Sequence, residues 1–348
     1  MGACDKVAQV RTRFLAVLWL SGCGVLGAPG AGGPEPWAPL GEWIGSERAR
    51  LAELAAGLGE DGEEIAAELA GVAETAEAGR LLLAAERLSS PRLGAEARAY
   101  RSERRGSVAD LPTLEAEARH VGSEIGRLDA RATGSASGPP AALRALSDAA
   151  WVRGRAYHGA AVSYARVTSV SAGLFYLGAA RSLAATAADL AGLAVAARAP
   201  GAGPSAEALE AELAELDRRT IAAYRAPGAE VEQHSAFIAL NAEVKEARDL
   251  LAAGRPVGAL LAALESRRRL EAILDDGAEA APELGRRAAS FRDRCEAAAW
   301  DASLGRLFVE RAEDALAAEV PNPRSLREAR AVLLHVLPRY FELHEETP

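Results

Sequence analysis

The feature that most constrains the fold is a helical spacing of apolar residues, clearest between residues 237 and 251. Phe237, Leu240, Val244, Ala247 and Leu251 follow one another at steps of three and four, which places them on one face of a helix. Charged residues fill most positions between them and predict a side that faces solvent. No segment of the body shows the strict apolar–polar alternation of a strand. The sequence therefore predicts an all-α protein.

Turn residues then divide the chain into helices. Gly254 can end the helix described above, and Pro256 can open the next one at its first turn, so we predict two antiparallel helices between Ala236 and Leu274. The same pattern predicts helices over 39–57, 60–88, 92–105, 111–131, 140–167, 171–197, 205–225, 229–252, 257–275, 282–318 and 324–344. We expect the long helix 282–318 to break near Gly305.

Part of this hairpin, Glu243 to Ser266, resembles a tetratricopeptide repeat. Ala247 fits the small residue of the repeat's first helix, Gly254 fits its turn, and Ala259 fits the small position of its second helix. Ala263 departs from the repeat, because an aromatic residue is usual there. No fixed period continues along the chain. Two arrangements stay open: antiparallel helical hairpins in a TPR-like array, or an irregular helical bundle.

The N-terminus has the features of a targeting segment. Three basic residues precede the apolar stretch Phe14–Leu20, which is much shorter than the roughly 20 residues of a membrane span. Leu20-Ser21-Gly22-Cys23 follows and resembles the lipobox of bacterial lipoprotein signal peptides. This resemblance implies cleavage before Cys23 and attachment of lipid to that residue. An ordinary cysteine after an ordinary signal peptide is the alternative.

This resemblance implies where the protein is held. Residues 1–22 are the predicted lipoprotein signal peptide, and residues 23–38, rich in Gly and Pro, are a predicted tether. The lipid on Cys23 implies a membrane partner in the bacterial cell envelope. Gly24 follows this cysteine where an aspartate would hold an enterobacterial lipoprotein at the inner membrane. The resemblance therefore favours the outer membrane.

The body divides in the sequence at one uncharged segment. Residues 132–140, ATGSASGPP, are small and flexible in composition, which is typical of a linker. They separate a predicted N-terminal helical region, 39–131, from a predicted helical-hairpin domain, 141–348. Most aromatic residues follow the linker, so we expect the second region to be the better packed.

No motif for chemistry is present in the sequence. The five histidines are scattered, and neither HExxH nor CxxC occurs, so we expect no metal site. The body also lacks a Walker-type phosphate loop and a GxSxG turn, and we expect no cofactor and no enzymatic activity. Cys295 is predicted to be a buried structural thiol. With 40 basic against 49 acidic residues, the chain is not expected to bind nucleic acid.

The aromatic residues supply the candidate binding surface, because they make up only 5% of the chain. Tyr157 and Tyr164 lie seven residues apart and share one face of a predicted helix. The proposed surface combines two groups, an aromatic set and a polar pair one helical turn apart: Trp151, Tyr157, Tyr164 and Tyr176, with Asn241 and Lys245. Such aromatic residues either pack in the core or line a groove.

Three functions remain open from the sequence. The leading hypothesis is a lipid-anchored adaptor or assembly factor that binds another envelope protein through a helical-repeat surface. The second is a helical bundle that binds a small molecule of the periplasm or cell surface in a pocket between helices, either as a binding protein or as an enzyme. The third is a passive structural spacer. An interior cavity with convergent polar groups would favour the second hypothesis.

Overall fold

The computed structural model describes residues 36–133, 138–195, 198–199, 203–225, 234–275, 277, 280–318 and 321–345. Residues 36–348 form one compact unit. Every regular element in the described part is a helix, which confirms the all-α prediction. The predicted signal peptide, Cys23 and the tether up to residue 35 lie outside the described residues. Within the described part, no helix is long and apolar enough to cross a membrane.

The helices are α1 (Ala38–Ala56), α2 (Glu60–Glu77), α3 (Leu81–Arg104), α4 (Leu111–Thr133), α5 (Ala141–Val167), α6 (Val170–Gly192), α7 (Ala206–Arg225), α8 (His234–Ala252), α9 (Pro256–Leu274), α10 (Ala281–Ala297), α11 (Ser303–Leu316), α12 (Pro323–Arg330) and α13 (Leu337–Glu345). A π-helical segment, Ala331–Val336, joins α12 to α13. The predicted hairpin is present as α8 and α9, and the turn between them contains Gly254 with φ of 71°.

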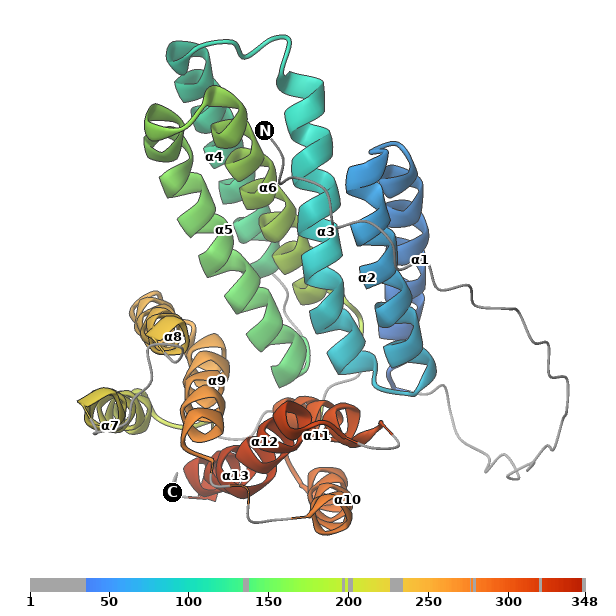
Figure 1. Cartoon of the computed structure of the whole chain (residues 1–348), viewed down its shortest axis with the longest axis vertical. Coiled ribbons are helices and arrows are strands. Elements are labelled where there is room, and N and C mark those ends of the chain that lie inside the picture. The colour runs from blue at the N-terminus through green and yellow to red at the C-terminus, as the bar shows by residue number, and fades with distance from the viewer. Residues whose placement is uncertain are drawn as a thin grey trace, which may run out of the picture. The chain divides into compact units, whose positions relative to one another are not determined.

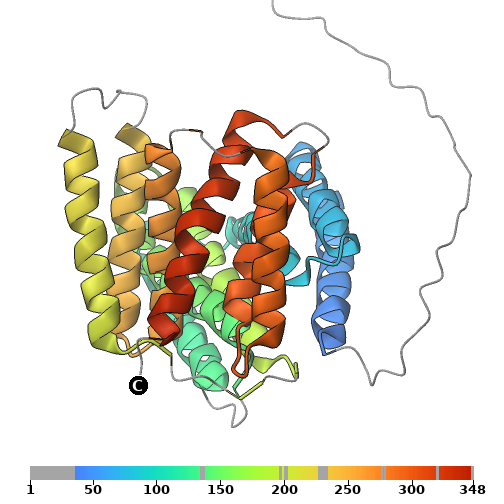
Figure 2. The same ribbon diagram turned by 90° about the horizontal axis from the view of Figure 1, so that it is seen from below.

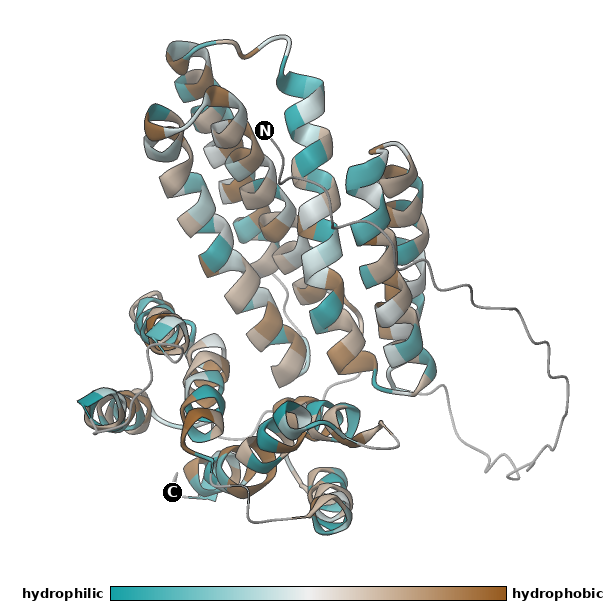
Figure 3. Ribbon diagram, in the orientation of Figure 1, coloured by the Kyte–Doolittle hydropathy of each residue, from teal (hydrophilic) through white to brown (hydrophobic). Residues whose placement is uncertain are grey.

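The α5–α6 hairpin is the centre of the arrangement (Figure 1). Helices α3 and α4 pack against α6, and α1 and α2 pack against α3. On the other side, α8, α9 and α11 contact α5, and α7 contacts α8 and α9. Helix α6 carries only two charged residues, Arg181 and Asp189, and Figure 3 shows it as mostly neutral or hydrophobic. Its low polarity follows from burial against three neighbouring helices.

Small residues allow the central helices to approach closely. A Cβ on Gly178 of α6 would lie 2.9 Å from the Cα of Ala97 in α3. A Cβ on Gly173 would lie 2.8 Å from the Cβ of Ala165 in α5. Carbon atoms pack best at about 3.5 to 4.0 Å, so no larger side chain fits at either glycine without moving a helix. The high alanine and glycine content therefore has a packing role.

Buried ion pairs join helices that are distant in sequence. Arg255, at the α8–α9 turn, donates to Asp148 of α5 at 2.6 Å. Arg267 of α9 bonds Glu212 of α7 at 2.7 Å, and Glu212 is only 2% exposed. Desolvation by burial raises the pKa of Asp148, and Arg255 acts against this shift. These contacts join α9 and the turn before it to α5 and α7.

Several helix boundaries differ from the prediction; α6, for example, ends at Gly192 and not at 197. Helix α2 ends at Glu77, where Gly79 with φ of 77° turns the chain, and α3 runs through Pro91 to Arg104. The break expected at residues 88–92 was wrong, because Pro91 is buried and its packing holds the helix together. The break expected at Gly305 lies earlier, between Ala297 and Ser303. Gly305 instead provides space for Tyr340, whose ring carbon lies 2.6 Å from the position of a Cβ.

The predicted linker 132–140 does not separate two compact units. Helices α3 and α4, which precede it, pack against α6, which follows it. Residues 134–137 lie outside the described part. Beyond them, the backbone N–H of Ala141 donates to Asp301 at 2.6 Å, and that of Ala142 donates to Ser303 at 2.9 Å. The start of α5 is thus fixed against the segment leading into α11.

Candidate functional site

The turn between α5 and α6 brings two long helices together at one end of the hairpin. Only Thr168 and Ser169 connect them. The Thr168 hydroxyl donates to the Tyr164 carbonyl at 2.7 Å and satisfies the end of α5. The Ser169 hydroxyl accepts from the Ala172 N–H at 3.1 Å and caps α6. The tight turn therefore fixes the relative register of side chains on the two helices.

This register gathers three tyrosines. Tyr176 of α6 stacks on Tyr164 of α5, with ring centroids 4.5 Å apart and planes at 23°. Tyr157, two turns earlier on α5, contacts the same ring at 5.2 Å and 58°. The predicted surface residues Tyr157, Tyr164 and Tyr176 are thus side by side. Together with Val167 we call them the tyrosine patch.

The tyrosine patch is an apolar surface that remains open to solvent. Tyr164 is 40% exposed and Val167 is 79% exposed, although most large apolar side chains of the described part are buried. The pKa of the Tyr176 phenol is raised, mainly by desolvation and to a smaller degree by the neighbouring phenols. These rings are held by one another, with pair energies of about 0.5 to 1.5 kcal/mol. The patch is preorganised and little conformational entropy is lost when a partner covers it.

The helices around the patch are held by polar contacts that leave the rings free. His158 of α5 has its Nε2 2.8 Å from the Ala118 carbonyl of α4. Arg166 donates to Glu115 of α4 at 2.9 Å. The guanidinium of Arg101 in α3 lies 5.9 Å from the ring of Phe175, the neighbour of Tyr176 in α6. Helices α3 and α4 thus support the hairpin end that carries the patch.

Trp151 belongs to a different contact. It lies on α5 beneath Arg255, whose guanidinium carbon is 4.0 Å from the ring centroid, and Arg155 lies over the same ring at 5.1 Å. Its indole ring packs against a small cluster that includes Leu183. Arg255 also bonds Asp148, so this tryptophan helps to fix α5 to the α8–α9 turn. Tyr157 packs against the same cluster, but among the described residues Trp151 forms no ring pair with the tyrosines of the patch.

Asn241 and Lys245 are exposed on α8 and stand apart from the patch. Lys245 bonds Asp249 one turn further on at 2.6 Å. In Figure 1, α8 lies beside the first part of α5, whereas the patch is at that helix's far end. Arg153 of α5 and Glu246 of α8, 3.1 Å apart, mark where the two helices meet. The predicted six-residue surface is therefore two or more separate sites.

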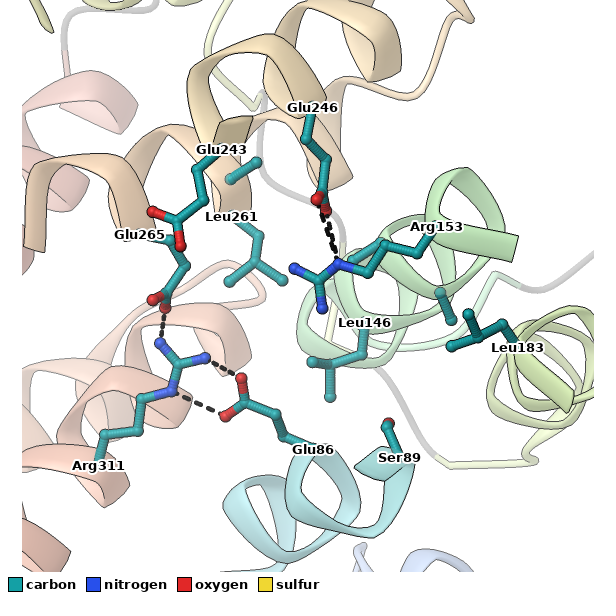
Figure 4. Close-up of a pocket in the computed structure, with 13 residues that line it drawn as sticks. Glu86, Ser89, Leu146, Arg153, Leu183, Glu243, Glu246, Leu261, Glu265 and Arg311 are labelled. Atoms are coloured by element: carbon teal, nitrogen blue, oxygen red, sulfur yellow. Dashed lines mark hydrogen bonds and ion pairs between the residues drawn. The ribbon is translucent and has the colours of Figure 1, made fainter. Parts of the chain in front are cut away.

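A small cavity lies between α3, α5, α8, α9 and α11, with Leu183 of α6 at its edge (Figure 4). Its volume is about 70 Å³, which is room for a few water molecules. Small-molecule sites usually occupy roughly 300 to 1,000 Å³. Apolar residues form part of its lining, and four glutamates and two arginines converge on it.

The charges around this cavity are bound to one another. Arg311 donates to Glu86 at 2.9 Å and also pairs with Glu265. Arg153 pairs with Glu246 across the opposite side, as Figure 4 shows. A ligand would have to displace one of these ion pairs. The arrangement is suited to joining α3, α5, α8, α9 and α11, and the cavity gives little support to a small-molecule site.

Sequence reasoning identified the tyrosines but missed Val167, the most exposed member of the patch. Its position at the last residue of α5 was the available signal, because a valine at a helix end lacks neighbours on one side. Comparison with known proteins found no match to this chain among protein-family models, curated proteins or solved structures.

Proposed function

We propose that this chain is a lipid-anchored protein of the bacterial cell envelope, held at the outer membrane, that binds another envelope protein through the tyrosine patch. The anchor rests on the sequence: Cys23 follows three residues that fit a lipobox, after an apolar stretch and basic residues. Several acyl chains on one cysteine would hold the protein firmly, since each buried methylene contributes about 0.8 kcal/mol.

The tyrosine patch is the observation that supports binding. The chain has six tyrosines, and three of them meet in the patch: Tyr164 is exposed, and Tyr157 and Tyr176 are half-buried beside it. Tyrosine is enriched in protein interfaces because its ring gives contact area and its hydroxyl gives a hydrogen bond. Elsewhere on the described surface many charged side chains form ion pairs with one another, for example Arg166 with Glu115 and Lys245 with Asp249.

The patch is distant from the point where the compact unit begins. Leu81, at the start of α3, packs beside Gly41 in the first turn of α1. Arg101, near the end of the same helix, lies over Phe175 next to the patch. Twenty residues of helix separate these two contacts, a length of about 30 Å. The first turn of α1 and the tyrosine patch therefore lie near opposite ends of α3, which suits a protein that is held at one end and binds at the other.

In-cell cross-linking of the full chain, followed by capture and mass spectrometry, tests this proposal. We expect a specific partner to be captured with the wild-type chain and lost with the double change Tyr164→Ala and Val167→Asp. Leu274→Asp is the matched control, since Leu274 is 47% exposed on α9 and lies outside the patch. Cys23→Ser should abolish both lipid attachment and capture.

Two outcomes would contradict the proposal. Capture that is unchanged by the double change would exclude the patch as the binding surface. A mature chain without lipid on Cys23 would exclude the anchor.

A further inference from the structure

Helix α7 forms an edge of the compact unit. It packs against α8 and α9 on one side, and it stands at the left edge of Figure 2, coloured yellow, with no helix beyond it. Its inner face is buried through Leu209, Leu213 and Leu216. Its opposite face is open to solvent.

The open face is a narrow stripe with a regular composition. Its six members follow the helical spacing and are all exposed: Glu207, Glu210, Ala214, Arg218, Ile221 and Arg225. Steps of three and four residues confine them to less than a quarter of the helix circumference. We call this set the α7 stripe.

Charge divides the α7 stripe into two halves. The first half is acidic, the middle carries Ala214, and the second half is basic with Ile221, which is 50% exposed. Arg218 pairs with Glu215 of its own helix at 2.5 Å. Glu207 and Arg225 form no ion pair with another residue that the structure describes. The stripe thus presents unpaired charges of opposite sign at its two ends.

We infer that the α7 stripe pairs with the same stripe of a second copy of this chain, with the two helices antiparallel. A two-fold axis at the level of Leu216, the middle of α7, places Glu207 of each copy opposite Arg225 of the other. Ala214, close to this axis, lets the helices approach, and Ile221 becomes covered in both copies. A parallel pair would instead place like charges together.

The expected dimer is weak. One helix pair buries less than the roughly 1,200 to 2,000 Å² of a standard stable interface, so the association depends on protein concentration. Charge on the stripe also suits the helix dipole, since acid lies at the first turn and base at the last. The test must therefore separate pairing between copies from stability within one copy.

Charge reversal in the full chain separates pairing between copies from stability within one copy. Two differently tagged copies are co-expressed, cross-linked in cells and captured through one tag, and the second tag is measured. We expect Glu207→Arg with Glu210→Arg, present in both copies, to reduce co-capture by about tenfold or more. Arg218→Glu with Arg225→Glu in both copies should do the same. Co-expression of the first double variant with the second should restore co-capture, because each acidic stripe then faces a basic one.

Glu63→Arg with Glu68→Arg is the control, since both residues are exposed on α2 and the change in net charge is the same. It should leave co-capture unchanged. Wild-type copies that fail to co-capture would overturn the inference. So would full co-capture by either double variant alone, or a mixture of the two variants that is no better than each alone.

Discussion

Close packing of α3 on α6 predicts the effect of one added methyl group. In Gly178→Ala, the new Cβ would lie 2.9 Å from both the Cα of Ala97 and the Cβ of Tyr100, and 3.2 Å from the Ala97 carbonyl oxygen. Contact with backbone atoms cannot be relieved by a rotamer change. The two helices must move apart by at least about 0.6 Å to reach a carbon–carbon distance of about 3.5 Å.

Two terms of opposite sign set the magnitude. Overpacking of this kind costs about 1 to 3 kcal/mol, and exchanging glycine for alanine inside a helix contributes about 1 kcal/mol in favour of folding. The stiffness of the backbone contact favours the upper part of the cost. We therefore predict a net loss of about 1 to 2 kcal/mol in the free energy of unfolding for Gly178→Ala.

Gly126→Ala is the matched control. Gly126 is exposed within α4, and no atom lies within 4 Å of its added Cβ, so only the helix-propensity gain of about 1 kcal/mol remains. Thermal unfolding followed by circular dichroism should show a lower Tm for Gly178→Ala and a higher Tm for Gly126→Ala, several degrees apart. Equal shifts in the two variants would refute the packing of α3 on α6 as described.

Three further predictions concern buried groups. Removal of Arg255 by change to Ala leaves Asp148 buried without its main cation and should cost about 3 to 5 kcal/mol of unfolding free energy, measured by thermal or denaturant unfolding. Burial lowers the pKa of His344, which stacks on Trp300 at 4.2 Å, so the fold favours the neutral ring. The contribution of neutral His344 to the free energy of unfolding is intact above the unfolded pKa of about 6.5 and is lost as the pH falls below that value. We therefore expect Tm to decline less on acidification in His344→Gln than in the wild type. Burial raises the pKa of the Cys295 thiol to about 12, so peptide-resolved mass spectrometry should find no alkylation of this residue at pH 8 until the protein unfolds; rapid labelling of the folded chain would contradict its burial.

The local elements could be predicted where the sequence pattern is strong. The spacing from Phe237 to Leu251, with Gly254 and Pro256, located the α8–α9 hairpin to within a residue or two at its turn. Pro91 misled the boundary prediction, because a proline usually ends a helix and its burial in this fold could not be read from the chain. Gly79, with positive φ, ended α2 instead.

The remaining differences between the predicted and the observed surface come from contacts between residues that are distant in the sequence. That Tyr157 and Tyr164 share a face followed from their separation of seven residues. The sequence also located the turn between α5 and α6 to within one residue, since the predicted helices end at 167 and begin at 171. That Tyr176 contacts both rings depends on how the two helices are rotated against each other, which the sequence does not give. Trp151 was grouped with them because it is close in sequence, but the partner that fixes its position, Arg255, is more than one hundred residues away.

Photo-cross-linking at the end of α5 shows directly whether the tyrosine patch contacts another protein. Val167 is replaced in the full-length chain by photoreactive benzoylphenylalanine, and Leu274 is replaced in the same way as the control, since both side chains are exposed. On irradiation of living cells, we expect one reproducible protein adduct from position 167 that is absent from position 274 and lost with Tyr164→Ala. An absence of any adduct from position 167 above the control would contradict the tyrosine patch as a protein-binding surface.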